Sequence, residues 1–600
     1  MKSVAFSTDK LQFWAWARFS FLSPCQNKNM STLCFRELFF PSMPRLLRAT
    51  VLGLLSGAIA TLPARSADEI YFDYGPFSRS LATSSLEAFA ENGTIDVGLA
   101  RYLRHVPPER QQDFQQVLAT PLSSLSSGIP EHLSDPFVLS QWLYSPIGES
   151  ALTGIGQLIQ TEGGQNGRQA LRAALILAAA DPAGLSIINI IRFYPTGAVR
   201  LDLREILALS RALNSNFDST EQLVRFASQE SAAAAAAEPV MDYSALPVLG
   251  ESGQLNVEQR TLLLQDDQRN RAYPVDIYLP DDLSAVQGPI PVMILSHGYG
   301  DTRTNPEAVA VARSLATNGF LVALPEHVGS NRDYQNDLTL GLNHESFEVM
   351  EFVNRPLDIR FLLDSLEQLN SSEFQGRLQL ERVGLLGHSF GGYTALAASG
   401  ATVDIERLQR QCTFETDVAP DKVNIGLALQ CRLLELVELP EAIQQLTDGS
   451  LADERIGLVM AFAPVSNLFG EEGMAKIQIP VVILGGANDM ATPIALEQLV
   501  AFRGLTTPQK YLYLGENLSH SPALTQLVLN VTNPNSEVVD SFSDISEVFS
   551  SLIISLVTAH GRVHLLEDES YRPYLTSSYV EAASVEPLNL NLLRFIPDEF

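Results

Sequence analysis

The chain has 600 residues, enough for two or three domains, and its 46% hydrophobic and 18% charged composition is not that of a disordered chain. Its formal net charge of −29 at pH 7 repels phosphate backbones, so nucleic-acid binding is not expected. No apolar run reaches the roughly 20 residues that cross a bilayer, and the four cysteines lack the spacing of zinc or thioredoxin-like sites.

A secretory signal peptide is predicted at residues 43–67. Two arginines precede an apolar stretch, which ends in the small-x-small cleavage site Ala64-Arg65-Ser66. Because a signal peptide begins a chain, we expect translation to start at Met43 and residues 1–42 to come from an over-extended gene model. The alternative is a buried core helix. The signal predicts export to the periplasm or the medium.

A helical domain is predicted at residues 68–228. The segment Gln169–Ala180 is rich in helix formers with apolar positions near a 3.6-residue period, and Asp181-Pro182 ends it. Residues 229–254 then contain six consecutive alanines. This low-complexity stretch is interpreted as a linker or a short exposed helix.

From residue 255 to 600, apolar runs of strand length alternate with helical segments, which predicts an α/β fold with a mostly parallel sheet and helices on both faces. In such sheets the active groups lie on loops beyond the carboxyl ends of the strands. The strands are predicted at Tyr273–Leu279, Val292–Ser296, Leu321–Leu324, Val383–Leu386, Ile456–Phe462, Val481–Leu484 and Lys510–Leu514.

The sequence Gly387-His388-Ser389-Phe390-Gly391 lies between a predicted strand and a predicted helix. This is the GxSxG pattern in the strand–turn–helix context of a nucleophile elbow. Gly387 and Gly391 leave room for the sharp turn, and the turn lifts the Ser389 hydroxyl above the sheet. Ser389 is therefore the predicted nucleophile.

A serine nucleophile needs a base that is oriented by an acid, and this fold has them in the chain order Ser, acid, His. Asp489 follows a predicted strand, and His520 follows the next one. We predict Asp489 as the acid and His520 as the base. The alternative role for Asp489 is that of a helix N-cap. The other histidines after Asp489 lie in or after a terminal helix.

Two backbone N–H groups are predicted to bind the oxyanion that forms during acyl transfer. One belongs to Phe390, directly after the nucleophile, and the other to Tyr299 in the glycine-containing loop that follows the strand Val292–Ser296. His297 and His388, which neighbour these residues, are expected to have structural roles.

Residues 401–455 separate a predicted helix from the next strand by far more than an ordinary loop. The insertion is rich in leucine and contains Cys412 and Cys431. We interpret it as a lid; an enlarged helical excursion without a gating role is the alternative. Export makes a disulfide between the two cysteines plausible, with two separate buried thiols as the alternative.

Residues 255–560 resemble bacterial α/β-hydrolases of the predicted dienelactone hydrolase and platelet-activating-factor acetylhydrolase group. The resemblance implies hydrolysis of small or lipid-like acyl esters without a metal or organic cofactor. The stretches that carry it are Ser296-His-Gly-Tyr-Gly300, Pro325-Glu-His327, Arg355-Pro-Leu-Asp-Ile-Arg-Phe-Leu-Leu-Asp364 and Gly387-His-Ser-Phe-Gly-Gly392.

Two departures from this group matter. Dienelactone hydrolases use a cysteine nucleophile where this chain has Ser389. In the acetylhydrolases the acid lies one strand earlier than Asp489 does here. The corresponding strand of this chain is Ile456–Phe462, and the residues after it, Ala463-Pro-Val-Ser-Asn467, include no carboxylate. Residues 68–228 resemble an uncharacterised helical domain that is often fused ahead of such hydrolases.

The sequence therefore predicts an exported serine esterase of the α/β-hydrolase fold that acts on a small-molecule or lipid ester. A serine peptidase shares the elbow, but no propeller repeat precedes the catalytic domain. A non-catalytic exported binding protein is the other alternative, although a binding protein would not need all three residues in this order.

Overall fold

The computed structural model describes residues 66–121, 135–243, 246–249, 253–412, 424–520, 542–586, 588–597 and 600, all within one compact unit, Ala64–Phe600. The predicted N-terminal extension 1–42 and all but the last two residues of the predicted signal peptide 43–67 lie outside the described residues. None of the helices in the described part of the chain is long and apolar enough to cross a membrane.

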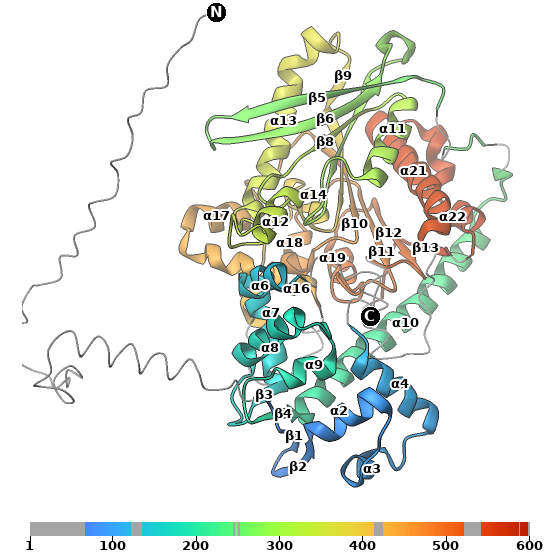
Figure 1. The fold of residues 1–600 in the computed structure, drawn as a ribbon. Coiled ribbons are helices and arrows are strands. Elements are labelled where there is room, and N and C mark those ends of the chain that lie inside the picture. Colours follow the sequence, from blue (N-terminus) through green and yellow to red (C-terminus); the bar gives the residue numbers. More distant parts are fainter. Residues whose placement is uncertain are drawn as a thin grey trace, which may run out of the picture. The chain divides into compact units, whose positions relative to one another are not determined.

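Within the described residues, a nine-stranded sheet forms the centre of the larger part of the molecule (Figure 1). Its strands are β5 (Val257–Asp266), β6 (Arg271–Pro280), β7 (Ile290–Ser296), β8 (Leu321–Pro325), β9 (Leu378–His388), β10 (Ile456–Phe462), β11 (Val481–Gly486), β12 (Lys510–Gly515) and β13 (Leu590–Leu593). They follow the order β13-β12-β11-β10-β9-β7-β8-β6-β5. The pairs from β12 to β8 are parallel, and those at both edges are antiparallel.

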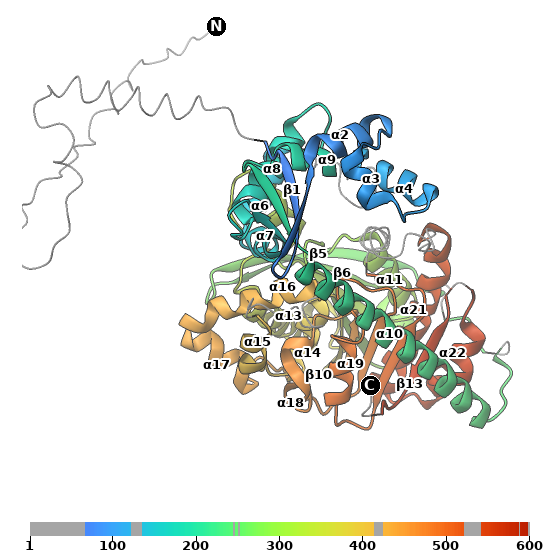
Figure 2. The ribbon, with the colours of Figure 1, turned by 90° about the horizontal axis from the view of Figure 1, so that it is seen from below.

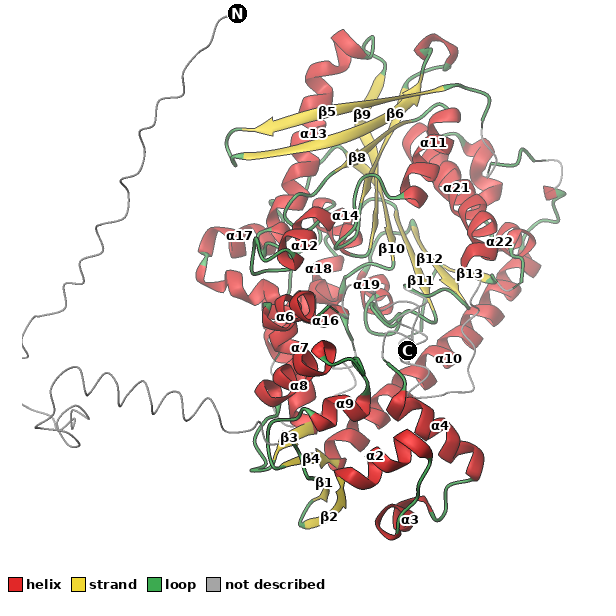
Figure 3. Cartoon of the chain, viewed as in Figure 1, coloured by secondary structure: helices red, strands yellow, loops and turns green. Residues whose placement is uncertain are grey.

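Helices cover both faces of this sheet (Figures 1 and 3), as the alternating pattern predicted. On one face lie α13 (Glu351–Glu373), α14 (Phe390–Ala398), α18 (Gly470–Met474) and α19 (Gln498–Gly504), and on the other α11 (Pro306–Thr317), α21 (Phe542–Leu566) and α22 (Ser577–Ala583). Side chains alternate between the two faces of a strand. In β7, Val292 and Ile294 join the first core, whereas Met293 and Leu295 join the second.

Both cores are apolar, which is why the central strands are continuous hydrophobic runs rather than alternating ones. The predicted α/β-hydrolase fold is confirmed. The strand bounds differ from the prediction by a few residues, and the two edge strands β5 and β13 were not predicted.

Residues 66–202 contain four short strands that the sequence analysis did not predict, in addition to helices. The sheet has the order β2-β1-β4-β3, with β1 (Glu69–Tyr74), β2 (Phe77–Ala82), β3 (Ile159–Thr161) and β4 (Ala198–Asp202). The helices are α2 (Thr83–Asn92), α3 (Val97–Leu103), α4 (Pro108–Ala119), α6 (Pro136–Tyr144), α7 (Pro146–Leu158), α8 (Arg168–Ala180) and α9 (Ile187–Arg192). Their buried side chains form a third core, separate from the two around the large sheet.

The predicted boundary at residue 228 and the start of the predicted linker 229–254 lie inside one helix, α10 (Leu203–Ala237). Ala is the best helix former, so the six alanines extend this helix rather than interrupt it. Leu223 and Ala227 are buried in the core of the large sheet. The Ser231 hydroxyl accepts the backbone N–H of Leu592 in β13 at 3.2 Å. The helix therefore covers the edge of the large sheet (Figure 2).

The insertion 401–455 is helical where it is described. It contains α15 (Ile405–Gln411), α16 (Gly426–Cys431), a 3-10 helix (Arg432–Glu438) and α17 (Pro440–Asp448). A disulfide joins Cys412 to Cys431, as predicted, with their Cα atoms 5.6 Å apart. Leu433, Leu436 and Leu446 are buried in the core beside α13 and α14, so these leucines do not line an open surface.

The burial of α10 yields a prediction about stability. Leu223 is 1% exposed, and Leu223→Ala should lower the free energy of unfolding by about 2–5 kcal/mol because it leaves a cavity in the main core. Leu207→Ala on the same helix is the matched control, since Leu207 is 46% exposed and should change stability by less than about 0.5 kcal/mol. Urea unfolding measures both. Equal midpoints for the two variants would contradict the packing of α10 against the hydrolase core.

Candidate active site

Ser389 lies in a sharp turn between β9, which ends at His388, and α14, which begins at Phe390. Its φ of +56° is in a region that non-glycine residues rarely adopt. The flanking glycines leave no room for a side chain. A Cβ on Gly387 would lie 1.9 Å from the carbonyl oxygen of Gly391, and one on Gly391 would lie 2.0 Å from that of Ser296. This backbone is the geometry of a nucleophile elbow.

The side chains of Ser389, His520 and Asp489 form a continuous hydrogen-bonded chain. His520 Nε2 lies 3.0 Å from Ser389 Oγ, and His520 Nδ1 lies 3.0 Å from Asp489 Oδ2. The Asp489 side chain is 1% exposed and that of His520 14%. The three side chains come from the loops after β9, β12 and β11, at one edge of the sheet. The structure thus brings together all three residues predicted from chain order.

The Asp489 carboxylate uses its two oxygens differently. Oδ1 accepts the backbone N–H groups of Ala491 at 2.9 Å and of Thr492 at 2.7 Å. Oδ2 faces His520 and accepts a hydrogen bond from the Thr492 hydroxyl at 2.8 Å. The carboxylate therefore caps the turn that follows it and also orients the histidine. Both roles fit one rigidly held side chain. The alternative role of a helix N-cap is wrong, because the next helix, α19, begins only at Gln498 and its N-cap is Glu497.

The pKa values of His520 and His388, the two histidines beside Ser389, are shifted in opposite directions. Burial lowers the pKa of His520, but the charge of Asp489 and its hydrogen bond outweigh burial and raise that pKa above its usual value. The His388 side chain is exposed, and its contact with the surrounding protein and the neighbouring His520 lower its pKa below the usual value. The ring centroids of His388 and His520 are 4.9 Å apart. His388 thus stays neutral at physiological pH and adds no second positive charge when His520 is protonated.

The two residues predicted to supply the oxyanion donors, Phe390 and Tyr299, belong to segments next to Ser389. Phe390 is the first residue of α14, where an N–H group has no acceptor within the helix. Tyr299 follows Gly298, and a Cβ on Gly298 would lie 3.4 Å from the Cβ of Ser389. The Tyr299 ring packs edge-on against Phe347, so only its backbone is available at the serine.

A buried arginine, which the sequence analysis did not single out, holds the loop that contains Gly298. Arg355 donates from Nη1 to the carbonyl of His297 at 2.8 Å and from Nη2 to that of Gly298 at 3.3 Å. Its guanidinium also lies over the Phe390 ring, 4.4 Å from the centroid. Burial lowers the pKa of Arg355 to about 10, so the group remains charged at neutral pH. One side chain thus contacts both of the segments that flank Ser389.

A network of buried charges compensates Arg355. Glu351 lies 3.6 Å from Arg355 Nε and 2.6 Å from Arg271 Nη2. Asp358 accepts hydrogen bonds from Arg271 and lies 3.3 Å from His327 Nδ1. Glu351, Arg355 and Asp358 have the spacing i, i+4, i+7 on α13, which places them on one face of this helix. Charged residues at that spacing are a sequence signal only for the part of the network that lies on α13.

His297 and His327 belong to the same buried layer. His297 Nδ1 donates to the Gly298 carbonyl at 2.8 Å, while its Nε2 accepts the backbone N–H of His327 at 3.0 Å. This arrangement requires a neutral ring, and burial lowers the pKa of both histidines well below its usual value. His297 therefore has the structural position expected for it.

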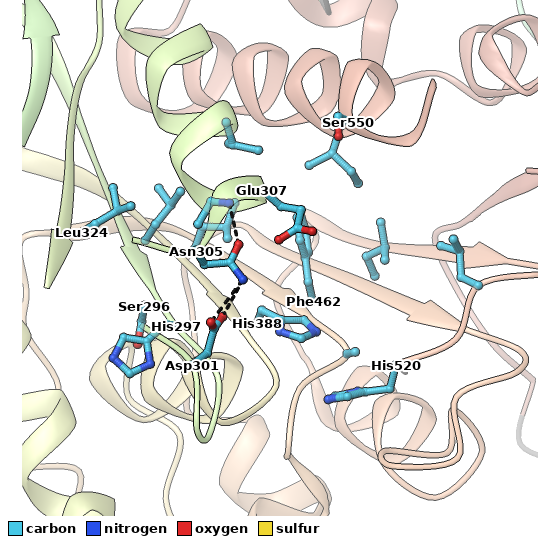
Figure 4. Close-up of a pocket in the computed structure, with 18 of the residues that line it drawn as sticks. Ser296, His297, Asp301, Asn305, Glu307, Leu324, His388, Phe462, His520 and Ser550 are labelled. Carbon is cyan, nitrogen blue, oxygen red and sulfur yellow. Dashed lines mark hydrogen bonds between the residues drawn. The ribbon is translucent and has the colours of Figure 1, made fainter. Parts of the chain in front are cut away.

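A cavity of about 390 Å³ lies beside His520 (Figure 4), and Ser389 is not among its described lining residues. His388, Asp489 and His520 line it, together with apolar residues at the carboxyl ends of the strands such as Leu386 and Phe462. Asp301 and Arg303 add charged groups from the loop before α11, and Glu307 adds one from its first turn. The cavity offers a mainly apolar wall next to the histidine.

The insertion 401–455 contributes none of the described residues that line this cavity, and its predicted role as a lid stays a prediction. The insertion is nevertheless connected by hydrogen bonds to the loops after β10 and β11. The buried Glu497 carboxylate accepts hydrogen bonds from Gln430 of α16 at 2.6 Å and from the backbone N–H groups of Ser466 and Asn467. Among the described residues, no three His, Cys, Asp or Glu side chains are grouped to hold a metal ion.

The buried network yields a second prediction. Arg355→Leu should lower the free energy of unfolding by about 3–5 kcal/mol because it leaves the buried Glu351 with less compensation. The control is Arg382→Leu, which breaks the exposed pair with Glu567 and should cost less than about 1 kcal/mol. Urea unfolding at neutral pH compares the two. A loss for Arg355→Leu no greater than for the control would show that the network does not stabilise the fold.

Two family models match parts of the chain. Residues 66–202 match "Alpha/beta hydrolase of unknown function (DUF1400)", and residues 267–402 match "Putative esterase". The first match covers the smaller sheet and its helices, and the second includes the elbow and the loop of Tyr299. No curated protein matches the chain. The fold and these similarities together support a hydrolase enzyme that acts on ester substrates.

Proposed function

We propose that the protein is a serine carboxylic ester hydrolase that acts on small or lipid-like acyl esters through an acyl-enzyme intermediate. The observation that carries the proposal is the hydrogen-bonded chain from Ser389 through His520 to Asp489, with both distances 3.0 Å. A serine hydroxyl is a weak nucleophile unless a base accepts its proton, and this arrangement supplies the base and the group that orients it.

In the acylation step, Ser389 Oγ attacks the ester carbonyl while His520 Nε2 takes the hydroxyl proton. Asp489 accepts the hydrogen bond from Nδ1, fixes the tautomer and stabilises the imidazolium. The tetrahedral intermediate then collapses, and His520 gives its proton to the departing alkoxide. In the deacylation step, His520 takes a proton from water, and the resulting hydroxide attacks the acyl-enzyme. The second tetrahedral intermediate then collapses, His520 returns the proton to Ser389 Oγ, and the carboxylic acid is released.

The N–H groups of Phe390 and Tyr299 would hold the oxyanion of each tetrahedral intermediate. One such donor is typically worth about 3–4 kcal/mol in the transition state. Arg355 supports this role indirectly, since it holds the carbonyls of His297 and Gly298 on the same loop. It is a positioning residue, because it does not face the reacting atoms.

The cavity beside His520 suits the apolar group of an ester. Its lining is mainly apolar, which favours an alkyl or acyl group over a sugar. The carboxylates of Asp301 and Glu307 in its lining, together with the net charge of −29, disfavour anionic substrates. We therefore expect neutral esters to be preferred.

The proposal includes export of the enzyme. The disulfide between Cys412 and Cys431 is typical of proteins that fold in oxidising compartments. The predicted signal peptide at 43–67 would direct that export.

The proposal is tested by hydrolysis of a chain-length series of p-nitrophenyl esters, from acetate to palmitate. Ser389→Ala should lose at least about 10⁴-fold in kcat/KM, and Asp489→Asn should lose about 10⁴-fold. Ser399→Ala is the matched control, because this hydroxyl only bonds the Ala395 carbonyl at the far end of α14. The control should keep full activity.

Two other outcomes would favour the alternatives. No turnover of any ester, with a fluorophosphonate still labelling Ser389, would point to a serine peptidase. Neither turnover nor labelling in a folded protein would point to a non-catalytic binding protein. Equal turnover by Ser389→Ala would refute the proposed nucleophile.

The pH dependence provides a further prediction. His520 must be neutral to act as a base, so kcat/KM should fall as the pH drops through the pKa of His520 in the free enzyme. Asp489 raises that pKa, and the residual activity of Asp489→Asn should therefore keep its acidic limb to a lower pH than the unmodified enzyme. An acidic limb that does not move would mean that another group controls it.

A further inference from the structure

A second cavity, of about 650 Å³, lies within residues 66–202 and is separate from the proposed active site. All four strands of the small sheet contribute to its lining, together with helices α2, α3, α4, α7, α8 and α9. Its lining belongs to the third core, whereas Ser389 and its neighbours lie among the cores of the large sheet. The two cavities have none of their described lining residues in common.

The lining of this cavity is wholly apolar. Of the twenty described residues that form it, fifteen are leucine or isoleucine, and none is charged. Its only hydroxyl groups belong to two tyrosines, and both are turned to backbone carbonyls. Tyr102 donates to Ser80 at 3.1 Å, and Tyr194 lies 3.5 Å from the carbonyl oxygen of Ile159. The tyrosines therefore present ring carbons to the cavity.

Such a volume is unusual for a core. Protein interiors contain few voids larger than a water molecule, and an apolar cavity of ~150 Å³ stays dry and binds benzene. This one is about four times larger and falls within the ~300–1,000 Å³ of small-molecule sites. Water gains no hydrogen bonds from its walls, so an apolar ligand is the occupant that the chemistry favours.

The rim of the cavity is apolar and accessible. Ile155 of α7 is 44% exposed and Phe114 of α4 is 38% exposed, although both also line the cavity. Large apolar side chains at an opening allow an apolar chain to enter without crossing a polar barrier. Its polar end can then remain in water at the rim.

We propose that residues 66–202 form a binding site for one long, unbranched aliphatic chain, such as that of a fatty acid or a fatty acyl ester. Among the described lining residues, no polar group is free to orient a compact polar ligand, so the affinity comes from burial of methylene groups. The affinity should therefore rise roughly fourfold for each methylene added, until the cavity is full. The site does not depend on ester hydrolysis at Ser389.

The test uses the full chain carrying Ser389→Ala, so that no ligand is consumed. Binding of cis-parinaric acid is followed by its fluorescence, and unlabelled fatty acids of 8 to 18 carbons compete for the site. Displacement that strengthens with chain length and then levels off supports the proposal. Competition by palmitate and by monopalmitoylglycerol distinguishes a free acid from an ester as the ligand.

Two variants locate the binding. Ile155→Asp puts a negative charge at the rim, where it repels the carboxylate of a fatty acid, and Leu175→Trp fills the cavity from α8; each should weaken binding at least tenfold. Val97→Asp is the matched control, because Val97 is 78% exposed on α3 and does not line the cavity. Melting curves confirm folding, and palmitate should raise the melting temperature of the control but not of Ile155→Asp.

Three results would overturn the proposal. The first is absence of parinaric acid binding to the folded protein. The second is equal binding by the control and both cavity variants, which would put the ligand elsewhere. The third is displacement by cholesterol as strong as that by palmitate, which would mean that the site does not select an unbranched chain. None of these results bears on turnover of esters at Ser389.

Discussion

The contacts of the buried Arg355 guanidinium organise the surroundings of Ser389. A planar cation can reach several backbone carbonyls at once, and here it bonds those of His297 and Gly298 while lying over the Phe390 ring. A charge buried to this extent persists only when it is compensated. Glu351 supplies that compensation from the preceding turn of α13, and Arg271 and Asp358 extend the network toward the antiparallel edge of the sheet. The loop beside the serine is therefore held by electrostatics inside the core rather than by contacts at the surface.

The backbone conformation of Ser389 depends on close packing of the neighbouring glycines. Its positive φ is tolerated because the turn is locked on both sides: Gly387 packs on the backbone of Gly391, which packs on that of Ser296. Strain of this kind persists where the surroundings over-determine it. The hydroxyl then meets His520, whose orientation is set by an aspartate that also caps its own turn. Each part of the proposed triad is thus fixed by contacts that do not involve a substrate.

Much of this could be predicted from the sequence, because the relevant signals are local. The elbow is a short motif between a strand and a helix, and Asp489 and His520 each follow an apolar run whose end is evident. What could not be predicted depends on contacts distant in sequence. The strand β2 has only one buried residue and exists because it pairs with β1. The alanine-rich stretch is part of a packed helix because Leu223, several residues earlier, is buried against a different part of the chain. The Arg355 network joins β6, α13 and the loops after β7 and β8, and no local pattern encodes that meeting.

The region 66–202 is connected to the hydrolase part by more than the covalent chain. Helix α10 starts directly after β4 of the small sheet and ends against α22, where Glu238 accepts the backbone N–H groups of Ser577 and Ser578. A second contact is made by α6, which packs on α12 (Arg332–Thr339). The cap of α12 is Asn331, and its side chain bonds Glu326 in the buried layer beneath the serine loop. The same short helix therefore touches the small domain on one side and the support of the proposed active site on the other. A continuous helix and a packed interface, rather than a flexible linker, join the two parts, which is why the smaller region belongs to the same compact unit as the large sheet.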